Sequence, residues 1–373
     1  MIFGDIPGLA STKKKLVDAV KQSHVAHAQL FAGSEGSAAM AMALAFATYL
    51  NCENPGDDAC GVCPQCQKNA KLIHPDVNFI FPTAATPKLA RDKASSDKFL
   101  KEWRGFLLEK PYGNIVDWSA HFGWENKMLS IPTHEKTAIS QALSLKAFEG
   151  KFKVMIIWLP EQMHQNTANG ILKILEEPPA NTVFLMVSNE PNKLLTTITS
   201  RTQKLLINNF SDDDIIGYLN TKHQVDQQGA ERIAYFADGS MRKALSLIDG
   251  FEDDTQEAFK EWFRYCYTYS FENLVALADG FQKKGKEYQL ELLRSAGRII
   301  REAMLHRVPV NELSRMPESE AGFMEKFSQV FSEEKVMSIA PKLDEAQYHI
   351  ERNANPKILF LDLSLFIAQI ARA

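Results

Sequence analysis

The 373-residue sequence lacks any long hydrophobic run, and this excludes a membrane-spanning helix. Its two longest nearly apolar stretches, Ala38–Leu50 and Ile358–Ala371, fall short of the roughly 20 residues that a span requires. The first residues place a run of lysines after a short apolar stretch, unlike a secretory signal. We therefore expect a cytoplasmic protein with no membrane partner.

The sequence also has little excess charge. Its 42 Lys and Arg residues against 46 Asp and Glu residues give a net charge of -4, which excludes a protein that coats nucleic acid through bulk positive charge. Apolar residues make up 45% and charged residues 24% of the chain, so collagen-like, low-complexity and wholly disordered chains are excluded as well. The length predicts two or three domains, each able to bury its own core.

Cysteine is scarce, but four of the five cysteines lie close together. Cys52, Cys60, Cys63 and Cys66 have the spacing C-x7-C-x2-C-x2-C. Four thiolates complete a tetrahedral shell, so the spacing predicts a structural zinc module over residues 52–66, with no open position for substrate or water. An iron–sulfur cluster uses the same four ligands and is a competing interpretation. A third interpretation is that the four cysteines are reduced and unrelated to one another.

Apolar runs alternate with helical segments up to residue 209, and this predicts an α/β fold with a parallel sheet. Strands are predicted at 27–32, 77–81, 153–159, 183–187 and 204–207, and helices at 38–50, 65–72, 97–109, 134–148 and 167–175. Beyond Asn209 only helical periodicity remains. Ser211 and the acidic residues after it predict a helix that begins near Asp212. A helix at 240–249 and about five longer ones follow, so we predict domains at 1–209, 210–250 and 251–373.

A glycine loop follows the first predicted strand, in the place of a Walker A phosphate loop. With Gly33 as the first glycine, Ala39 and Met40 occupy the positions of the phosphate-binding lysine and the magnesium-binding hydroxyl. Gly36 lies within the loop, and the strand at 153–159 ends in Trp158 and Leu159 instead of acidic residues. The loop is therefore degenerate, and we expect no ATP cofactor. An ordinary α/β turn unrelated to nucleotide binding is the alternative.

Three longer strings add a family resemblance. NGILKILEEPP at 169–179, SRTQ at 200–203 and GSMRKAL at 239–245 resemble the bacterial clamp-loader branch of the AAA+ family, and the resemblance extends over about residues 5–250. It implies an AAA+ α/β domain with the zinc module at 1–209, a small helical lid domain at 210–250, and an all-α collar domain for oligomerisation at 251–373.

The resemblance also implies roles for individual residues. Ser200 and Arg201 match a motif whose arginine acts as a finger on a neighbouring subunit's ATP, although Thr202 replaces the usual cysteine. A guanidinium suits this role because its planar fork and permanent charge complement a phosphate. A surface salt bridge is the alternative for Arg201. Arg242 matches a sensor arginine of the lid, with packing or an interdomain contact as its alternative.

The function implied by the resemblance is that of a non-hydrolysing member of the DNA polymerase III clamp loader. Its implied partners are the motor subunits gamma or tau, delta, the β sliding clamp through the assembly, and primed DNA. An active ATPase of the gamma or tau type, and a zinc-organised adaptor outside replication, are the competing functions. The aromatic segment 83–131 receives no function from the sequence.

Overall fold

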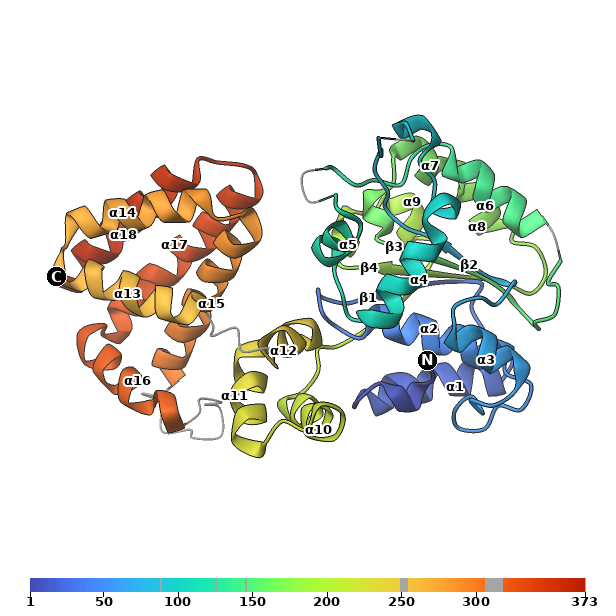
Figure 1. Cartoon of the computed structure of the whole chain (residues 1–373), viewed down its shortest axis with the longest axis horizontal. Helices are drawn as coiled ribbons and strands as arrows, with labels where there is room; N and C mark the ends of the chain where they lie inside the picture. Colours follow the sequence, from blue (N-terminus) through green and yellow to red (C-terminus); the bar gives the residue numbers. More distant parts are fainter. Residues whose placement is uncertain (88, 125–126, 145, 249–253, 306–317, 373) are drawn as a thin grey trace. The chain divides into compact units, whose positions relative to one another are not determined.

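The computed structural model describes residues 1–87, 89–124, 127–144, 146–248, 254–305 and 318–372. The chain forms two compact units, Met1–Ser246 and Leu247–Ala373, and each is described by itself (Figure 1). Among the residues described, no helix is long and apolar enough to cross a membrane. The predicted boundary after residue 250 lies outside the described residues, and the one after residue 209 falls inside the first unit. The three-domain division stays a prediction.

A parallel sheet forms the centre of the first unit and confirms the predicted α/β fold. Its strands have the order β2-β3-β4-β1-β5, and all of their pairings are parallel. Every residue of β1, β3 and β4 is buried, as expected for strands covered on both faces, whereas the edge strand β5 is mostly exposed. The strands are β1 (Ala28–Ala32), β2 (Val77–Ile80), β3 (Lys153–Trp158), β4 (Thr182–Ser188) and β5 (Gln203–Leu206).

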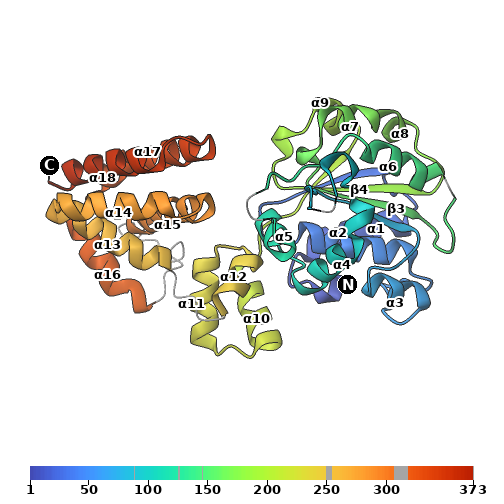
Figure 2. The same cartoon turned by 45° about the horizontal axis from the view of Figure 1, so that its top comes forward.

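Helices cover both faces of the sheet (Figures 1 and 2). On one face lies α2 (Ala39–Asn51), all of whose residues are buried, with α1 (Ala10–Lys21) and α3 (Pro64–Ala70) next to it. The other face is covered by α6 (Glu135–Ser144), α7 (Gln165–Gly170), α8 (Leu172–Glu176) and α9 (Thr196–Thr199). Short 3-10 helices are η1 (Phe3–Asp5), η2 (Arg91–Lys93), η3 (Ser96–Phe99), η4 (Pro160–Gln162) and η5 (Pro191–Lys193).

Two predicted helices differ from the observed ones. The predicted helix at 167–175 is divided between α7 and α8 at Ile171, directly after Gly170, a residue type that weakens a helix interior. The predicted helix at 134–148 ends at Ser144 in α6. The backbone N–H groups of Phe148, Glu149 and Gly150 instead donate to the carboxylate of Asp76. Hydrogen bonds to an ionised group replace those of a further helical turn.

The aromatic segment 83–131 forms a second core. The predicted helix near 97–109 is present as η3 followed by α4 (Leu100–Glu109), but α5 (Ile115–Phe122) was not predicted. Trp103 of α4 and Trp118 of α5 are fully buried, and both rings lie against Phe81, with centroids 4.2 and 5.5 Å away. Burial of aromatic side chains therefore holds the described part of this segment against the end of β2.

Three helices complete the first unit. They are α10 (Asp212–His223), α11 (Gln227–Ala237) and α12 (Met241–Ile248). The predicted start of α10 is confirmed, because Ser211 Oγ accepts from the backbone N–H of Asp214 over 3.1 Å and the Asp214 carboxylate accepts from the N–H of Ser211. The predicted helix at 240–249 is observed through Ile248, and residue 249 lies outside the described residues.

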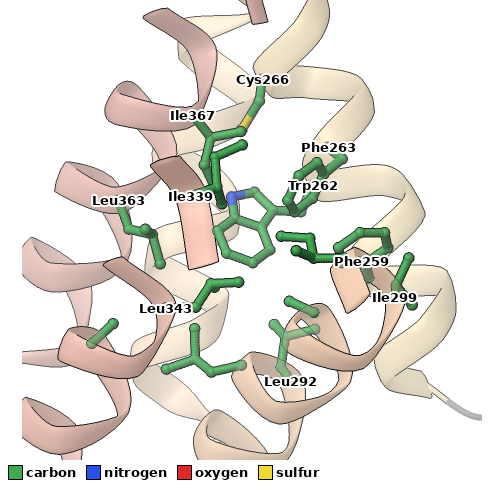
Figure 3. Packing of buried hydrophobic residues seen from close by; sticks show 14 of the residues in the cluster. Phe259, Trp262, Phe263, Cys266, Leu292, Ile299, Ile339, Leu343, Leu363 and Ile367 are labelled. Carbon is green, nitrogen blue, oxygen red and sulfur yellow. The ribbon is translucent and has the colours of Figure 1, made fainter. Parts of the chain in front are cut away.

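The second unit is helical throughout its described part. Figure 3 shows its core, in which the fully buried indole of Trp262 lies among side chains from α15, α17 and α18. Trp262 Nε1 donates to Ser364 Oγ over 2.8 Å, so the one polar atom of the indole is satisfied. The helices are α13 (Asp254–Thr268), α14 (Phe271–Lys283), α15 (Lys286–Leu305), α16 (Glu318–Val330), α17 (Glu333–Glu351) and α18 (Pro356–Arg372).

Candidate functional site

The loop after β1 lies at the carboxyl edge of the sheet, where a phosphate loop would lie. Gly33 follows β1 and α2 begins at Ala39, so strand, loop and helix occur in the predicted order. Gly36 has a φ of 76°, and a Cβ atom there would lie 2.0 Å from Ser240 Oγ. The backbone N–H of Met241 donates to the Gly36 carbonyl oxygen over 2.9 Å. The start of α12 is therefore in direct contact with the loop.

Little space remains beside this loop. The cavity there has a volume of about 10 Å³, comparable with one water molecule, whereas small-molecule sites enclose about 300 Å³ or more. Ala39 and Met40, at the positions of the missing lysine and hydroxyl, are buried in its wall. Tyr112, from the loop before α5, and Trp158, from the end of β3, are buried there as well. The chain's own side chains therefore leave little space beside the loop.

Acidic side chains near the loop have protein partners. Asn114 Nδ2 donates to Glu35 Oε2 over 3.3 Å. Glu161 Oε1 accepts from the backbone N–H groups of Asn189 and Glu190 at 3.0 and 3.2 Å, and burial raises the pKa of Glu161. Glu161 therefore holds the turn that follows β4.

Arg242 of α12 forms a two-point ion pair with Asp117 of α5. Its Nε donates to Asp117 Oδ2 over 2.5 Å and its Nη2 to Oδ1 over 3.1 Å. Burial acts to raise the pKa of Asp117, but the hydrogen bonds and charge of Arg242 outweigh it and hold the pKa below its usual value. The pair joins α12 to the aromatic segment. This contact is of the kind that the packing interpretation of Arg242 predicts, and the sensor role stays a prediction.

Arg201 lies just after α9 with its guanidinium on the protein surface. Both Nε and Nη2 donate to Glu176 Oε1, and the Nε contact spans 2.6 Å. Nη1 donates to the Thr197 carbonyl oxygen over 2.9 Å and to Ser200 Oγ over 3.3 Å. The side chains of Arg201 and Glu176 keep 33% and 47% of their surface exposed. The arginine is thus both oriented and accessible.

This arginine lies at the opposite edge of the sheet from the glycine loop. Glu176 ends α8 just before β4 begins at Thr182, and Arg201 lies two residues before β5 begins at Gln203. In a parallel sheet these amino ends share one edge, whereas Gly33 follows the carboxyl end of β1. A five-residue strand spans about 16 Å, so Arg201 cannot reach the loop of its own chain.

The four predicted metal ligands do come together. The sulfur atoms of Cys52, Cys60, Cys63 and Cys66 all lie within 4.8 Å of one another, and the Cys60 and Cys66 sulfurs are 3.9 Å apart. Sulfurs in a tetrahedral zinc site lie about 3.8 Å apart, since each is about 2.3 Å from the ion. The four thiols can therefore hold a metal ion. No metal ligand was predicted elsewhere.

Backbone N–H groups donate hydrogen bonds to some of these sulfurs. The N–H groups of Val62 and Cys63 lower the pKa of the Cys60 thiol to about 7, whereas burial raises the pKa of Cys66. The Cys60 N–H donates to Cys52 Sγ over 3.3 Å, and the Cys63 N–H to Cys60 Sγ over 3.3 Å. Metal binding must release the protons that remain on the buried thiols.

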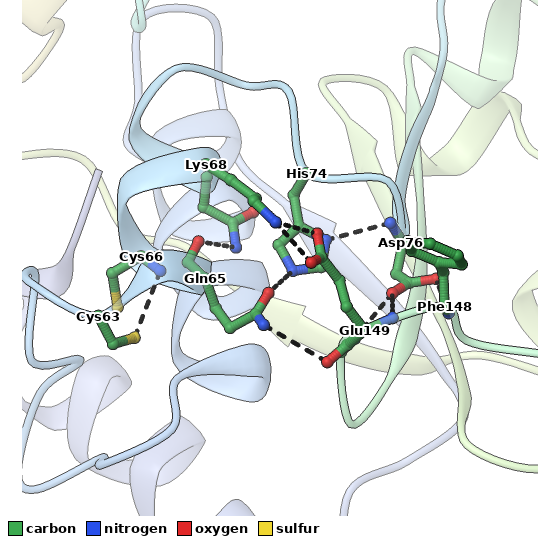
Figure 4. A network of polar contacts seen from close by, with 10 residues as sticks. Cys63, Gln65, Cys66, Lys68, His74, Asp76, Phe148 and Glu149 are labelled. Carbon is green, nitrogen blue, oxygen red and sulfur yellow. Dashed lines mark hydrogen bonds and ion pairs between the residues drawn. The ribbon is translucent and has the colours of Figure 1, made fainter.

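A polar network joins the cysteine module to the sheet (Figure 4). Gln65 Oε1, between two of the cysteines, accepts from His74 Nε2 over 2.6 Å, and the Asp76 N–H donates to His74 Nδ1 over 3.1 Å. Lys68 of α3 forms an ion pair with Glu149. Asp76 and Glu149 lie just before β2 and β3, so the network fixes the module at the amino edge of the sheet.

A groove of about 810 Å³ lies beside the aromatic segment. Its lining includes an arginine, a lysine and two histidines, together with Glu161 and Ser130. The first four are Arg91, Lys136, His134 and His164. Arg91 and Lys136 contribute positive charge to this groove, whose lining also includes the apolar side chains Met128, Pro132 and Met163.

Sequence reasoning missed two partners of the predicted residues. Asp117 follows Asn114 by three residues, and these two form a capping box at the start of α5. Their spacing was therefore a usable signal for the start of this helix. Glu176 stands within the LEEPP string, but nothing in the sequence places it beside Arg201, which is 25 residues away.

Comparison with known proteins identifies the family. The family model described as "DNA polymerase III, delta subunit" matches residues 8–211. The chain is 26% identical over 192 residues to DNA polymerase III subunit delta' of Bacillus subtilis, covering 52% of this chain and 45% of that protein. It is 30% identical over 177 residues to subunit delta' of Pseudomonas aeruginosa, covering 47% of this chain and 41% of that protein.

A tau subunit is also similar to the chain. DNA polymerase III subunit tau of Bacillus subtilis is 30% identical over 253 residues, covering 66% of this chain and 37% of that protein. The matched regions thus span less than half the length of each of these relatives. Because the family model matches more than half of the chain, the chain belongs to the DNA polymerase III delta-subunit family of clamp-loader proteins.

Proposed function

We propose that the chain is a non-hydrolysing stator subunit of the DNA polymerase III clamp loader, in the role of a delta' subunit. It supplies Arg201 to ATP bound by an adjacent motor subunit, gamma or tau. One observation carries this proposal: Arg201 is exposed at the edge of the sheet opposite to its own glycine loop. An arginine in that place can serve a nucleotide on another chain and none on its own.

The closed glycine loop supports the non-hydrolysing role. A nucleotide needs a cavity many times larger than the 10 Å³ beside Met40 and Tyr112. Ala39 supplies no charge for a γ-phosphate, and Trp158 supplies no ligand for magnesium. We therefore expect no ATP to bind this chain.

The chemistry of Arg201 supports a role in phosphoryl transfer. Charge grows on the γ-phosphate oxygens in the transition state, and a preorganised guanidinium stabilises that charge. Ser200 contributes by accepting from Arg201 Nη1, which restricts the rotation of the side chain. The proposed catalytic unit in trans is therefore Arg201 supported by Ser200.

The cysteine module has a structural role in this proposal. Four thiolates around zinc leave no open position for water or substrate. Cys52, Cys60, Cys63 and Cys66 would hold the ion, and the ion would supply folding energy to a loop-rich segment. Asp58, inside the module, accepts from the backbone N–H groups of Phe3 and Gly4 at 3.1 and 2.7 Å. The metal would thereby also fix the first residues of the chain.

The partners follow from the role. We propose that the chain binds the motor subunits and delta, that it meets the β sliding clamp through the assembly, and that the assembly binds primed DNA. The groove with Arg91, His134, Lys136 and His164 supports a DNA contact because these side chains suit backbone phosphates. Residues 251–373, which make up most of the helical unit Leu247–Ala373, are the proposed collar, and residues 210–250 are the proposed lid.

The test is ATP turnover by the complex reconstituted with the motor subunits, delta, the clamp and primed DNA. Replacing Arg201→Ala should lower turnover at the affected site by a factor of about 10³, the low end for an arginine finger. Arg232→Ala, an exposed arginine of α11, is the matched control and should leave turnover unchanged. Unchanged turnover and clamp loading with Arg201→Ala would exclude the proposed function.

An active motor subunit of the gamma or tau type is the second candidate, favoured by the long match to tau. It predicts magnesium-dependent ATP binding by the chain alone. The filled loop cavity and the absent lysine oppose it.

A further inference from the structure

Glu176 is the acidic partner of Arg201, and its backbone is held in place on two sides. Leu175, the residue before it, is fully buried in the core under α8, and its carbonyl oxygen is 3.0 Å from His27 Nε2. His27 itself lies just before β1, the strand between β4 and β5. Pro178 and Pro179 follow shortly after and restrict the backbone beyond the helix. Glu176 therefore projects from a rigid part of the amino edge.

The backbone of Arg201 is anchored in the same core. Ile198 of α9 is 1% exposed and belongs to the same buried cluster as Leu175. The Arg201 N–H donates to the Ile198 carbonyl oxygen over 3.0 Å. The backbones of Glu176 and Arg201 are therefore both fixed, and the ion pair fixes the long side chain of Arg201.

The hydrogen bonds within the described residues use four of the five N–H donors of the Arg201 guanidinium. Glu176 takes the Nε hydrogen and one Nη2 hydrogen, while Thr197 and Ser200 take the two Nη1 hydrogens. An arginine has five N–H donors, so within the described part of the chain one Nη2 hydrogen stays without a partner. The three partners thus fix the plane of the guanidinium, and the partly exposed side chain keeps one N–H donor for a further partner.

We propose that Glu176 is a positioning residue for the trans-acting Arg201. Its carboxylate holds the guanidinium in the orientation that meets the γ-phosphate of the neighbouring subunit. This inference rests on the proposed function, because it needs Arg201 to act on that phosphate. An unrestrained arginine would lose rotational freedom when it meets the phosphate, and Glu176 removes that loss in advance.

The position of the hydrogen bond is what matters here, more than the charge. A surface ion pair contributes little through its charge because water screens it. The amide of glutamine keeps an oxygen acceptor in the same place without the charge. Glu176→Gln should therefore keep the arginine oriented, and Glu176→Ala should release it.

The experiment measures kcat and KM for ATP in the reconstituted complex with primed DNA. With Glu176→Ala, kcat should fall about tenfold while KM stays within about twofold, since the orientation matters in the transition state. Glu176→Gln should retain at least half of the wild-type kcat. Glu177→Ala, the exposed neighbour, is the matched control and should leave both constants unchanged. Combined with Arg201→Ala, Glu176→Ala should cause no further loss.

The outcomes separate this inference from the proposed function. If Arg201→Ala lowers turnover but Glu176→Ala does not, or raises it, Glu176 does not position the arginine and this inference fails alone. An equal fall in kcat with Glu176→Ala and Glu176→Gln contradicts it as well, because the charge and not the acceptor would then be responsible. If Arg201→Ala has no effect, both the proposed function and this inference fail. Thermal unfolding of each variant shows whether a loss of kcat comes from misfolding. If Glu176→Ala misfolds, the kcat of Glu176→Gln still tests the inference.

Discussion

The glycine loop after β1 and the surface around Arg201 lie at opposite edges of the parallel sheet, and they differ in how much surface the chain leaves open. At the carboxyl edge, the loop after β1 is covered by the start of α12, and Tyr112 and Met40 reduce its cavity to about 10 Å³. At the amino edge, Arg201 and Glu176 keep a third to a half of their side-chain surface exposed. The loop that would bind nucleotide in a motor protein has little space beside it here, whereas the guanidinium that could serve a neighbour is partly open.

The stabilising contacts of the two edges also differ. The carboxyl edge is held by the Arg242–Asp117 ion pair, which joins α12 to the aromatic segment. The amino edge is held near β2 and β3 by the cysteine module and its polar network, and near β4 and β5 by the buried cluster under α8 and α9. One edge is joined by a partly buried ion pair, while the other keeps the Arg201–Glu176 pair partly exposed.

Removing the metal should have the largest effect, at the amino edge. Structural zinc sites contribute about 10–16 kcal/mol of apparent binding free energy, so Cys66→Ser should abolish stoichiometric metal binding and lower the thermal midpoint of the first unit. Elemental analysis and thermal denaturation measure both. Cys266→Ser, at a buried thiol of the second unit, is the matched control and should keep the metal. Stoichiometric metal in Cys66→Ser would contradict the zinc proposal, and iron in place of zinc would support the cluster interpretation.

Breaking the ion pair at the carboxyl edge should have a smaller effect. Asp117→Asn leaves the partly buried Arg242 without its charged partner and should destabilise the first unit by about 2 kcal/mol at pH 7. Hydrogen exchange should rise in α12. Asp213→Asn, in the exposed first turn of α10, is the control and should cost no more than about 1 kcal/mol.

The Arg242–Asp117 ion pair should also make the stability difference between wild type and Asp117→Asn depend on pH. The folded-state pKa of Asp117 lies below its unfolded value of about 3.9, so the pair stabilises the fold above that pH. The stability difference between wild type and Asp117→Asn should therefore shrink as the pH falls through the folded pKa. Urea unfolding at pH 7 and pH 3 measures it, and a difference that grows in acid would contradict the assignment.

Much of the fold was predictable because its signals are local. The five strands are short apolar runs bounded by turns, and Ser211 with Asp214 marks the start of α10. The four cysteines were predicted as one site because a run of two-residue spacers brings sulfurs together without long-range contacts. The early end of α6 depended on a competing contact, the carboxylate of Asp76 from a distant segment. The break between α7 and α8 has a local signal in Gly170.

The partners of the candidate site were not predictable for the same reason. Glu176 meets Arg201 only because β4 and β5 flank β1, an order that the sequence does not state. Asp117 meets Arg242 across 125 residues. Residue identity alone predicted a degenerate phosphate loop, while the place of Tyr112 in the wall of the adjacent cavity required the packed fold.

Titration of the isolated chain with a labelled ATP analogue and magnesium tests the central claim most directly, because it asks whether the glycine loop after β1 can hold a nucleotide. The small cavity beside this loop predicts no binding up to about 1 mM, which corresponds to a binding free energy weaker than about -4 kcal/mol. Binding in the micromolar range, dependent on magnesium, would contradict this account. The chain would then be a motor subunit with its own nucleotide.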